Sequence, residues 1–148
     1  MSKYRFGLPM SGIVLLALLA VPRVVAHDLD LVGPGVNAVL VFAPLVSWLV
    51  VVLAKRASNP LVTLTVIGFV YGVFLAIGHQ VLWTWAINEE PRLGGNLADV
   101  PEAAQEVIFR AFAVAASLVT GTLVGLAVGV VAWLLQRISI PYFRNRPR

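Results

Sequence analysis

The sequence predicts an all-α integral membrane protein, a bundle of four transmembrane helices with both termini in the cytoplasm. Hydrophobic residues make up 59% of the 148 residues and charged residues only 12%, about half the charged fraction of a typical soluble domain. Four long apolar segments are separated by short polar stretches. Each segment is long enough to cross a hydrocarbon layer of roughly 30 Å.

The first apolar segment covers residues 6–26 and follows a short basic lead. Pro22 and Arg23 interrupt its far end, and small residues up to Ala26 precede His27. A basic start, an apolar core and small residues at the end are also typical of a secretory signal peptide. We favour a retained first helix because further spans follow, whereas cleavage would leave three spans.

The second and third spans are predicted at residues 36–54 and 60–87. Pro44 lies in the middle of the second span, where it frees a carbonyl and is expected to bend the helix. The third span is longer than a bilayer requires and is expected to tilt or project. Trp83 lies near its interfacial end, and an external loop is predicted at 88–100.

The fourth span is predicted at 101–137. Asp99 is expected to be its N-cap, with Pro101 as the first helical residue. Pro141 is expected to stop the helix from continuing. The segment 138–148 is then a basic cytoplasmic tail that lies against anionic lipid headgroups.

Topology follows from the positions of the basic residues. Cytoplasmic loops of membrane proteins carry an excess of Lys and Arg. All seven acidic residues fall on the opposite side from most of the 11 basic residues. The basic side, which we therefore assign to the cytoplasmic face of the plasma membrane, carries Lys3, Arg5, Lys55, Arg56, Arg137, Arg144, Arg146 and Arg148.

Small residues recur every four positions in the third and fourth spans. This spacing places them on one face of a helix, where they allow another helix to approach closely. An antiparallel register that sets Gly72 level with Gly121 also sets Gly68 level with Gly125. The sequence therefore predicts GxxxGxxxG packing, a glycine zipper between these two spans, formed by Gly68, Gly72, Ala76, Ala113, Ser117, Gly121, Gly125 and Gly129.

Several classes of function receive no support from the sequence. The chain has no cysteine, so disulfides and thiolate chemistry are excluded. It contains no phosphate-binding loop, no HExxH motif and no nucleophile elbow, and the basic tail is too short for a nucleic-acid site. We place no carboxylate among the predicted helices, which disfavours a proton-coupled exchanger of the four-helix multidrug type.

Polar residues near the outer ends of the spans form the predicted outer polar cluster. In one interpretation Arg110 pairs with Glu106 and His79 makes one interhelical hydrogen bond. In the other, the cluster lines a small cationic pocket that binds an anionic lipid group or a carboxylate. The cluster consists of Arg23, His79, Gln80, Trp83, Glu106 and Arg110.

His27 and His79 permit a third interpretation. Each lies about 19 residues after the cytoplasmic start of its helix, so both are expected at a similar depth. A haem or a metal ion held by two imidazoles would need that depth and suitable orientation. An interfacial role for His27 is the alternative.

The sequence supports two hypotheses of function. The first is a non-enzymatic membrane subunit or scaffold that packs with itself, as an oligomer, or with a larger partner through the small-residue faces. The second is a small-solute or lipid-binding protein, a transporter or an intramembrane enzyme that uses the outer polar cluster.

Overall fold

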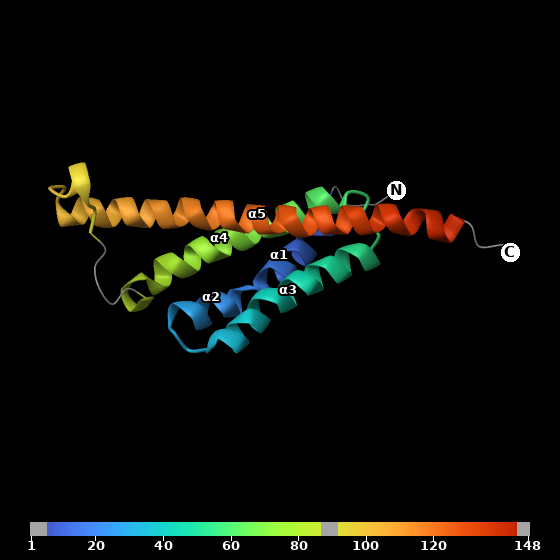
Figure 1. Cartoon of the computed structure of the whole chain (residues 1–148), viewed down its shortest axis with the longest axis horizontal. Coiled ribbons are helices and arrows are strands. Elements are labelled where there is room, and N and C mark those ends of the chain that lie inside the picture. Colours follow the sequence, from blue (N-terminus) through green and yellow to red (C-terminus); the bar gives the residue numbers. More distant parts are fainter. Residues whose placement is uncertain (1–5, 87–91, 145–148) are drawn as a thin grey trace.

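The computed structural model describes residues 6–86 and 92–144, and in these ranges the chain is helical apart from short connections (Figure 1). Four helical stretches are long and apolar enough to cross a membrane, α1 and α2 together counting as one. This confirms the predicted all-α class with four candidate membrane spans. The helices are α1 (Met10–Leu18), α2 (Val21–Asp28), α3 (Pro34–Ala54), α4 (Pro60–Ala86), the short 3-10 helix η1 (Gly95–Leu97) and α5 (Glu102–Arg144).

The first span is two helices, which corrects the single helix predicted at 6–26. Pro22 has no N–H to donate and its ring crowds the preceding turn, which disfavours a regular helix at this point. The N–H groups of Leu19 and Ala20 instead bond three residues back, at 3.2 Å each. The carbonyl of Leu16, freed from its usual partner, accepts a hydrogen bond of 2.7 Å from Trp48 Nε1 of α3. The irregular turn between α1 and α2 thus provides a carbonyl acceptor for Trp48, and this hydrogen bond joins α3 to α1.

Two helices end in the same left-handed turn. At the end of α2, Asp30 has φ 50° and its N–H bonds to His27, while Leu31 bonds back to Ala26. At the end of α3, Arg56 has φ 49° and Ala57 bonds back to Val52 in the same pattern. This is the Schellman arrangement, which satisfies carbonyls left free at a helix end.

Several helix boundaries differ from the prediction. α3 begins at Pro34, two residues early, because proline suits the first helical position, and it continues through Pro44. α4 ends at Ala86. α5 begins at Glu102, with the carbonyl of Pro101 accepting the first helical hydrogen bonds, so Asp99 does not occupy the N-cap position.

The predicted end of the fourth helix at 137 is also wrong. α5 has 43 residues and runs through Pro141 to Arg144, so residues 138–144 belong to the helix rather than to a tail. Proline removes one N–H donor and crowds the carbonyl four residues earlier, but it need not end a helix, and α3 likewise continues past Pro44. Several predicted charges lie outside the described residues, namely Lys3, Arg5, Glu89, Glu90, Arg146 and Arg148.

The most extensive contact in the fold is between α4 and α5. A Cβ atom added to Gly121 would lie 2.5 Å from the carbonyl oxygen of Gly68 and 2.5 Å from the Cα of Gly72. A Cβ atom added to Gly129 would lie 3.0 Å from the carbonyl of Leu61. The two backbones therefore approach each other at positions that leave no room for a side chain.

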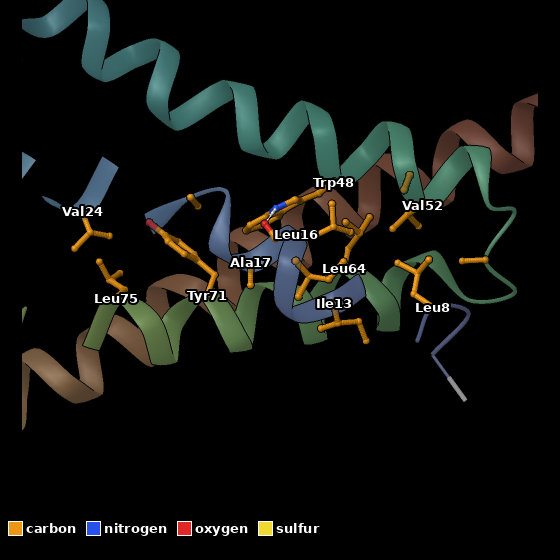
Figure 2. Packing of buried hydrophobic residues seen from close by; sticks show 14 residues of the cluster. Leu8, Ile13, Leu16, Ala17, Val24, Trp48, Val52, Leu64, Tyr71 and Leu75 are labelled. Atoms are coloured by element: carbon orange, nitrogen blue, oxygen red, sulfur yellow. Dashed lines mark hydrogen bonds between the residues drawn. The ribbon is translucent and has the colours of Figure 1, made fainter. Parts of the chain in front are cut away.

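A core of apolar side chains fills the space between α1, α3 and α4 (Figure 2). Ile13, Trp48 and Leu64 are fully buried there, one from each helix. The ring of Trp48 meets that of Tyr71 edge-on, with centroids 5.8 Å apart. Val24 and Leu75 extend this apolar cluster toward the polar side chains of α2 and α4.

Candidate functional site

The structure divides the outer polar cluster into two contact groups on either side of α4. The His–Asp group consists of His27, Asp28 and His79 and joins α2 to α4. The Arg110 group consists of Gln80, Trp83, Glu106 and Arg110 and joins α4 to α5. His79 and Gln80 are neighbours in the sequence, so the two groups meet on α4.

In the His–Asp group, the carboxylate of Asp28 lies between two imidazoles. Nδ1 of His79 lies 2.6 Å from Oδ2 of Asp28, and Nδ1 of His27 lies 3.5 Å from Oδ1. The side chain of Asp28 is only 6% exposed, whereas those of His79 and His27 are 33% and 57% exposed. The shorter contact is thus also the more buried one.

This finding corrects the view that no carboxylate lies among the helices. The sequence analysis ends the first span at residue 26, which leaves Asp28 in a turn. The structure continues α2 to Asp28, one turn beyond Val24 and on the same face. Val24 is 1% exposed, and its Cγ1 lies 2.8 Å from where a Cβ atom of Gly78 would be. The absence of a side chain at Gly78 lets this face reach α4.

Position also sets the electrostatics of Asp28. It is the last residue of α2, and the C-terminal end of a helix carries a partial negative charge that opposes an acidic side chain. A buried carboxylate in that place needs a positive or hydrogen-bonding partner from elsewhere. His79 supplies the partner from α4.

In the Arg110 group, the guanidinium of Arg110 has three partners. Its Nε donates to Oε1 of Glu106 at 2.8 Å, and its Nη1 lies 3.3 Å from Oε1 of Gln80. The guanidinium carbon lies 4.8 Å from the centre of the Trp83 ring. Gln80 Nε2 in turn donates to the carbonyl of Arg110 at 3.2 Å. This geometry agrees with the first interpretation of the cluster, in which its polar groups bind one another.

Arg23 is the member of the cluster for which the structure gives no such contact. Its Nε atom is buried without a hydrogen-bond partner within the described part of the chain. It lies on α2, five residues before Asp28. A buried donor of this kind carries a desolvation penalty, which a bound acceptor would remove.

The structure limits which imidazole atoms of His27 and His79 could bind a haem or a metal ion. Both imidazoles turn Nδ1 toward the same carboxylate, which leaves Nε2 as the atom for any ligation. In residues 6–86 and 92–144, no group of three or more His, Cys, Asp or Glu side chains could hold a metal ion. Ligation by these two histidines stays a prediction.

Sequence reasoning missed two residues that organise this end of the molecule. Asp28 could have been found from its spacing of four residues after Val24. Gln105 is 8% exposed; its Oε1 accepts from the N–H of Leu93 at 2.7 Å and its Nε2 donates to the carbonyl of Val100 at 2.7 Å. Gln105 thereby binds the segment from Leu93 to Val100 to α5, through backbone contacts that cannot be predicted from a sequence pattern.

Several hydroxyl groups within the spans bond to their own helices, as expected for such residues, and that of Thr63 bonds in addition to the carbonyl of Phe6, outside α4. Ser117 donates to the carbonyl of Ala113 at 2.7 Å, and Thr122 to that of Leu118 at 2.7 Å. Ser47 and Thr65 do the same in α3 and α4. These side chains therefore add little to a ligand site.

Comparison with known proteins supplies no family for this chain. No protein-family model, no curated protein and no solved structure matches it. Its function is therefore argued from the helices and side chains themselves.

Proposed function

We propose that this chain is a non-enzymatic membrane subunit or scaffold that packs with a second copy or a larger partner. The observation that carries the proposal is α5. It has 43 residues, about 60 Å at roughly 1.5 Å per residue, which is about twice the hydrocarbon thickness. It extends past α3 and α4 at both ends (Figure 1). A helix of this length offers a continuous surface to a neighbour both within and beyond the bilayer.

The exposed face of α5 suits such a contact. Phe112 is 71% exposed, and Val119 and Leu123 are each 57% exposed. Its glycine face is turned to α4, so that face is occupied within the chain. Association through the predicted small-residue faces then requires the helix of another molecule to replace α4, whereas association through the large apolar face does not.

We further propose that both termini are cytoplasmic and that the plasma membrane holds the bundle. Lys55 and Arg56 follow α3, and Arg137 lies near the other end of α5 from Glu102 and Glu106. The excess of Lys and Arg at one end supports this orientation. Close packing of glycine faces, rather than the hydrophobic effect, is the force we assign to the α4–α5 contact in lipid.

Cross-linking tests the association. Because the natural chain has no cysteine, a single cysteine at Phe112, Val119 or Leu123 reports contacts between chains, and the pair Ala76→Cys with Ser117→Cys reports the α4–α5 register within one chain. We expect disulfide-linked dimers from the single variants in lipid nanodiscs or native membranes, or a co-purifying membrane protein linked to them. A chain that stays monomeric and uncoupled in both settings contradicts the proposal.

A second candidate function rests on Arg23. Its partnerless buried Nε favours an anionic ligand, a lipid phosphate or a carboxylate, near the start of α2. Since His79 and Arg110 already hold Asp28 and Glu106, Arg23 would be the main determinant. We expect Arg23→Gln to reduce co-purifying anionic lipid, while Arg92→Gln, which alters a side chain that is 79% exposed, leaves it unchanged. Equal lipid retention in both variants would exclude this candidate.

A further inference from the structure

We propose that Lys55, Arg56 and Arg137 form a binding site for the phosphate headgroup of an anionic lipid. All three side chains are exposed, at the end of the bundle where α3 turns into α4. In the part of the chain that the structure describes, none of them takes part in an ion pair. The site differs both from the predicted tail at 138–148 and from Arg23 on α2.

Arg56 has a backbone conformation that suits glycine better. Its φ of 49° lies in the left-handed region, which is sterically unfavourable for a residue with a Cβ atom. The turn holds it there, since its N–H bonds to Leu53 at 3.0 Å and that of Ala57 bonds to Val52 at 3.2 Å. Glycine is the usual residue at this position of a Schellman turn. A cation also suits the negative end of α3, but Lys55, the C-cap, already supplies one. A strained arginine here therefore points to a function of its charge.

The α3–α4 turn is fixed to the other elements at this end. Gln136 Nε2 of α5 donates to the carbonyl of Ala57 at 3.3 Å, across 79 positions of the sequence. Ala57 is 3% exposed, and its Cβ lies 2.8 Å from where a Cβ atom of Gly7 would be. Arg137 follows Gln136 directly, so the fold brings its charge to the level of Arg56.

The surface of α5 next to Arg137 suits a lipid. The guanidinium carbon lies 4.0 Å from the centre of the Trp133 ring. Stacking on the ring face leaves the N–H donors in the guanidinium plane free to bind a phosphate. Val130, Trp133 and Leu134 precede Arg137 by seven, four and three residues, hence on the same face. They are 42%, 37% and 47% exposed, and this apolar face leads from the charge toward the middle of the span, where acyl chains lie.

The net charge of the site decides which headgroup fits. A phosphatidylcholine headgroup carries its own cation, so it does not offset unpaired basic side chains. Phosphatidylglycerol carries a phosphate without a cation, and basic residues beside a membrane span attract such lipids. In the proposed orientation this end faces the cytoplasmic leaflet. The site itself does not depend on that orientation, since a nanodisc offers the same lipids to both ends.

Native mass spectrometry of the full chain tests the site. The protein is released from nanodiscs of phosphatidylcholine with a minority of phosphatidylglycerol, and the retained lipids are counted. We expect phosphatidylglycerol to be enriched severalfold, and less so as the salt is raised from about 0.05 to 0.5 M. Arg56→Gly should lower the enrichment severalfold and yet preserve the turn, because glycine suits its φ. Arg137→Gln should lower it likewise.

Asp30→Gly is the matched control. Asp30 has φ 50° in the same kind of turn at the end of α2, so this variant makes the same backbone change without removing a cation, and it should retain the enrichment. Unchanged enrichment in Arg56→Gly or in Arg137→Gln would overturn the inference. So would an equal loss in Asp30→Gly.

Two further measurements separate this site from other sources of anion binding. In the background of Arg23→Gln, the loss caused by Arg56→Gly should persist, and its absence there would assign the retained lipid to Arg23 instead and overturn the inference. Inorganic phosphate at constant ionic strength should leave the retained phosphatidylglycerol unchanged. Displacement of the lipid would identify a free anion as the ligand and would overturn the lipid assignment.

Discussion

The two sides of α4 hold their neighbouring helices by different means. Toward α5, Gly68 and Gly121 bring two backbones together over a surface without side chains. Toward α2, Gly78 leaves room for Val24, and the contact of the Asp28 carboxylate with the His79 imidazole completes the packing. The contact with α5 thus depends on the close approach of two backbones, whereas the contact with α2 depends on one apolar side chain and one polar pair.

The largest effect is expected from Gly121→Ala, which breaks the contact that depends on shape. The added Cβ would meet backbone atoms of Gly68 and Gly72 at 2.5 Å, and backbone cannot rotate away. We expect a loss of about 1–3 kcal/mol in the free energy of unfolding, measured by reversible unfolding in mixed detergent micelles. Gly35→Ala is the control, because nothing lies within 4 Å of its added Cβ, and it should be neutral or stabilising by up to about 1 kcal/mol. Equal effects at both positions would contradict the packing argument.

Removing the imidazole by His79→Leu breaks the polar contact between α4 and α2. The buried carboxylate of Asp28 then keeps only the more distant His27, and we expect a loss of about 1–3 kcal/mol at neutral pH. The losses of stability in His79→Leu and in Asp28→Asn should not add up to the loss in the double variant, since the double variant leaves no unpaired charge. Additive losses in this cycle would show that the two side chains act separately. Arg92→Leu, which alters an exposed ion pair, should leave stability unchanged.

Trp48→Phe tests the hydrogen bond that anchors α1, the first half of the first span, to α3. It removes the donor to Leu16 while keeping an aromatic ring beside Tyr71. We expect a loss of about 1 kcal/mol, because the carbonyl of Leu16 loses one of its two donors and keeps only the N–H of Leu19. Hydrogen exchange should increase in α1 more than in α5. The reverse order would mean that the anchor lies elsewhere.

Gly78→Ala gives the smallest effect and sharpens the comparison with Gly121. The new Cβ would meet Cγ1 of Val24 at 2.8 Å rather than backbone atoms, so part of the clash is relieved by movement of α2. The gain in helix propensity offsets a further part, and we expect a loss below about 1 kcal/mol. Distances between spin labels on α2 and α4 should lengthen while those between labels on α4 and α5 stay constant. Lengthening of both would show that the two contacts are not independent.

Much of the architecture could be predicted from residue patterns, and the failures have local causes. The four apolar stretches were predicted because hydrophobic runs of this length have few other uses. The interruption at Pro22 was noted, but one helix was predicted through it to residue 26, since the sequence does not show that Trp48 of another helix donates to a carbonyl in the irregular turn. The error at Pro141 was the opposite one: the helix was predicted to stop there, but α5 continues to Arg144.

The candidate site was predicted in part for a similar reason. The pairing of Arg110 with Glu106 follows from their spacing on one helix, and it was predicted as one alternative. The pairing of His79 with Asp28 spans 51 positions and requires the height and rotation of two helices to be known. The anionic ligand of Arg23 and the ligation of a metal or haem by His27 and His79 both remain predictions.

By itself the sequence determined the all-α class, the four candidate spans and the positions of the small residues, because hydrophobicity and the helical repeat are local properties of the chain. The tertiary structure decided which polar groups are partners. Burial of Asp28 against His79, and of Gln105 against the backbone of its loop, depends on how one helix lies on another. From the sequence, Asp28 at the end of α2 would be judged exposed. It is buried because α4, which has no side chain at Gly78, packs closely against α2.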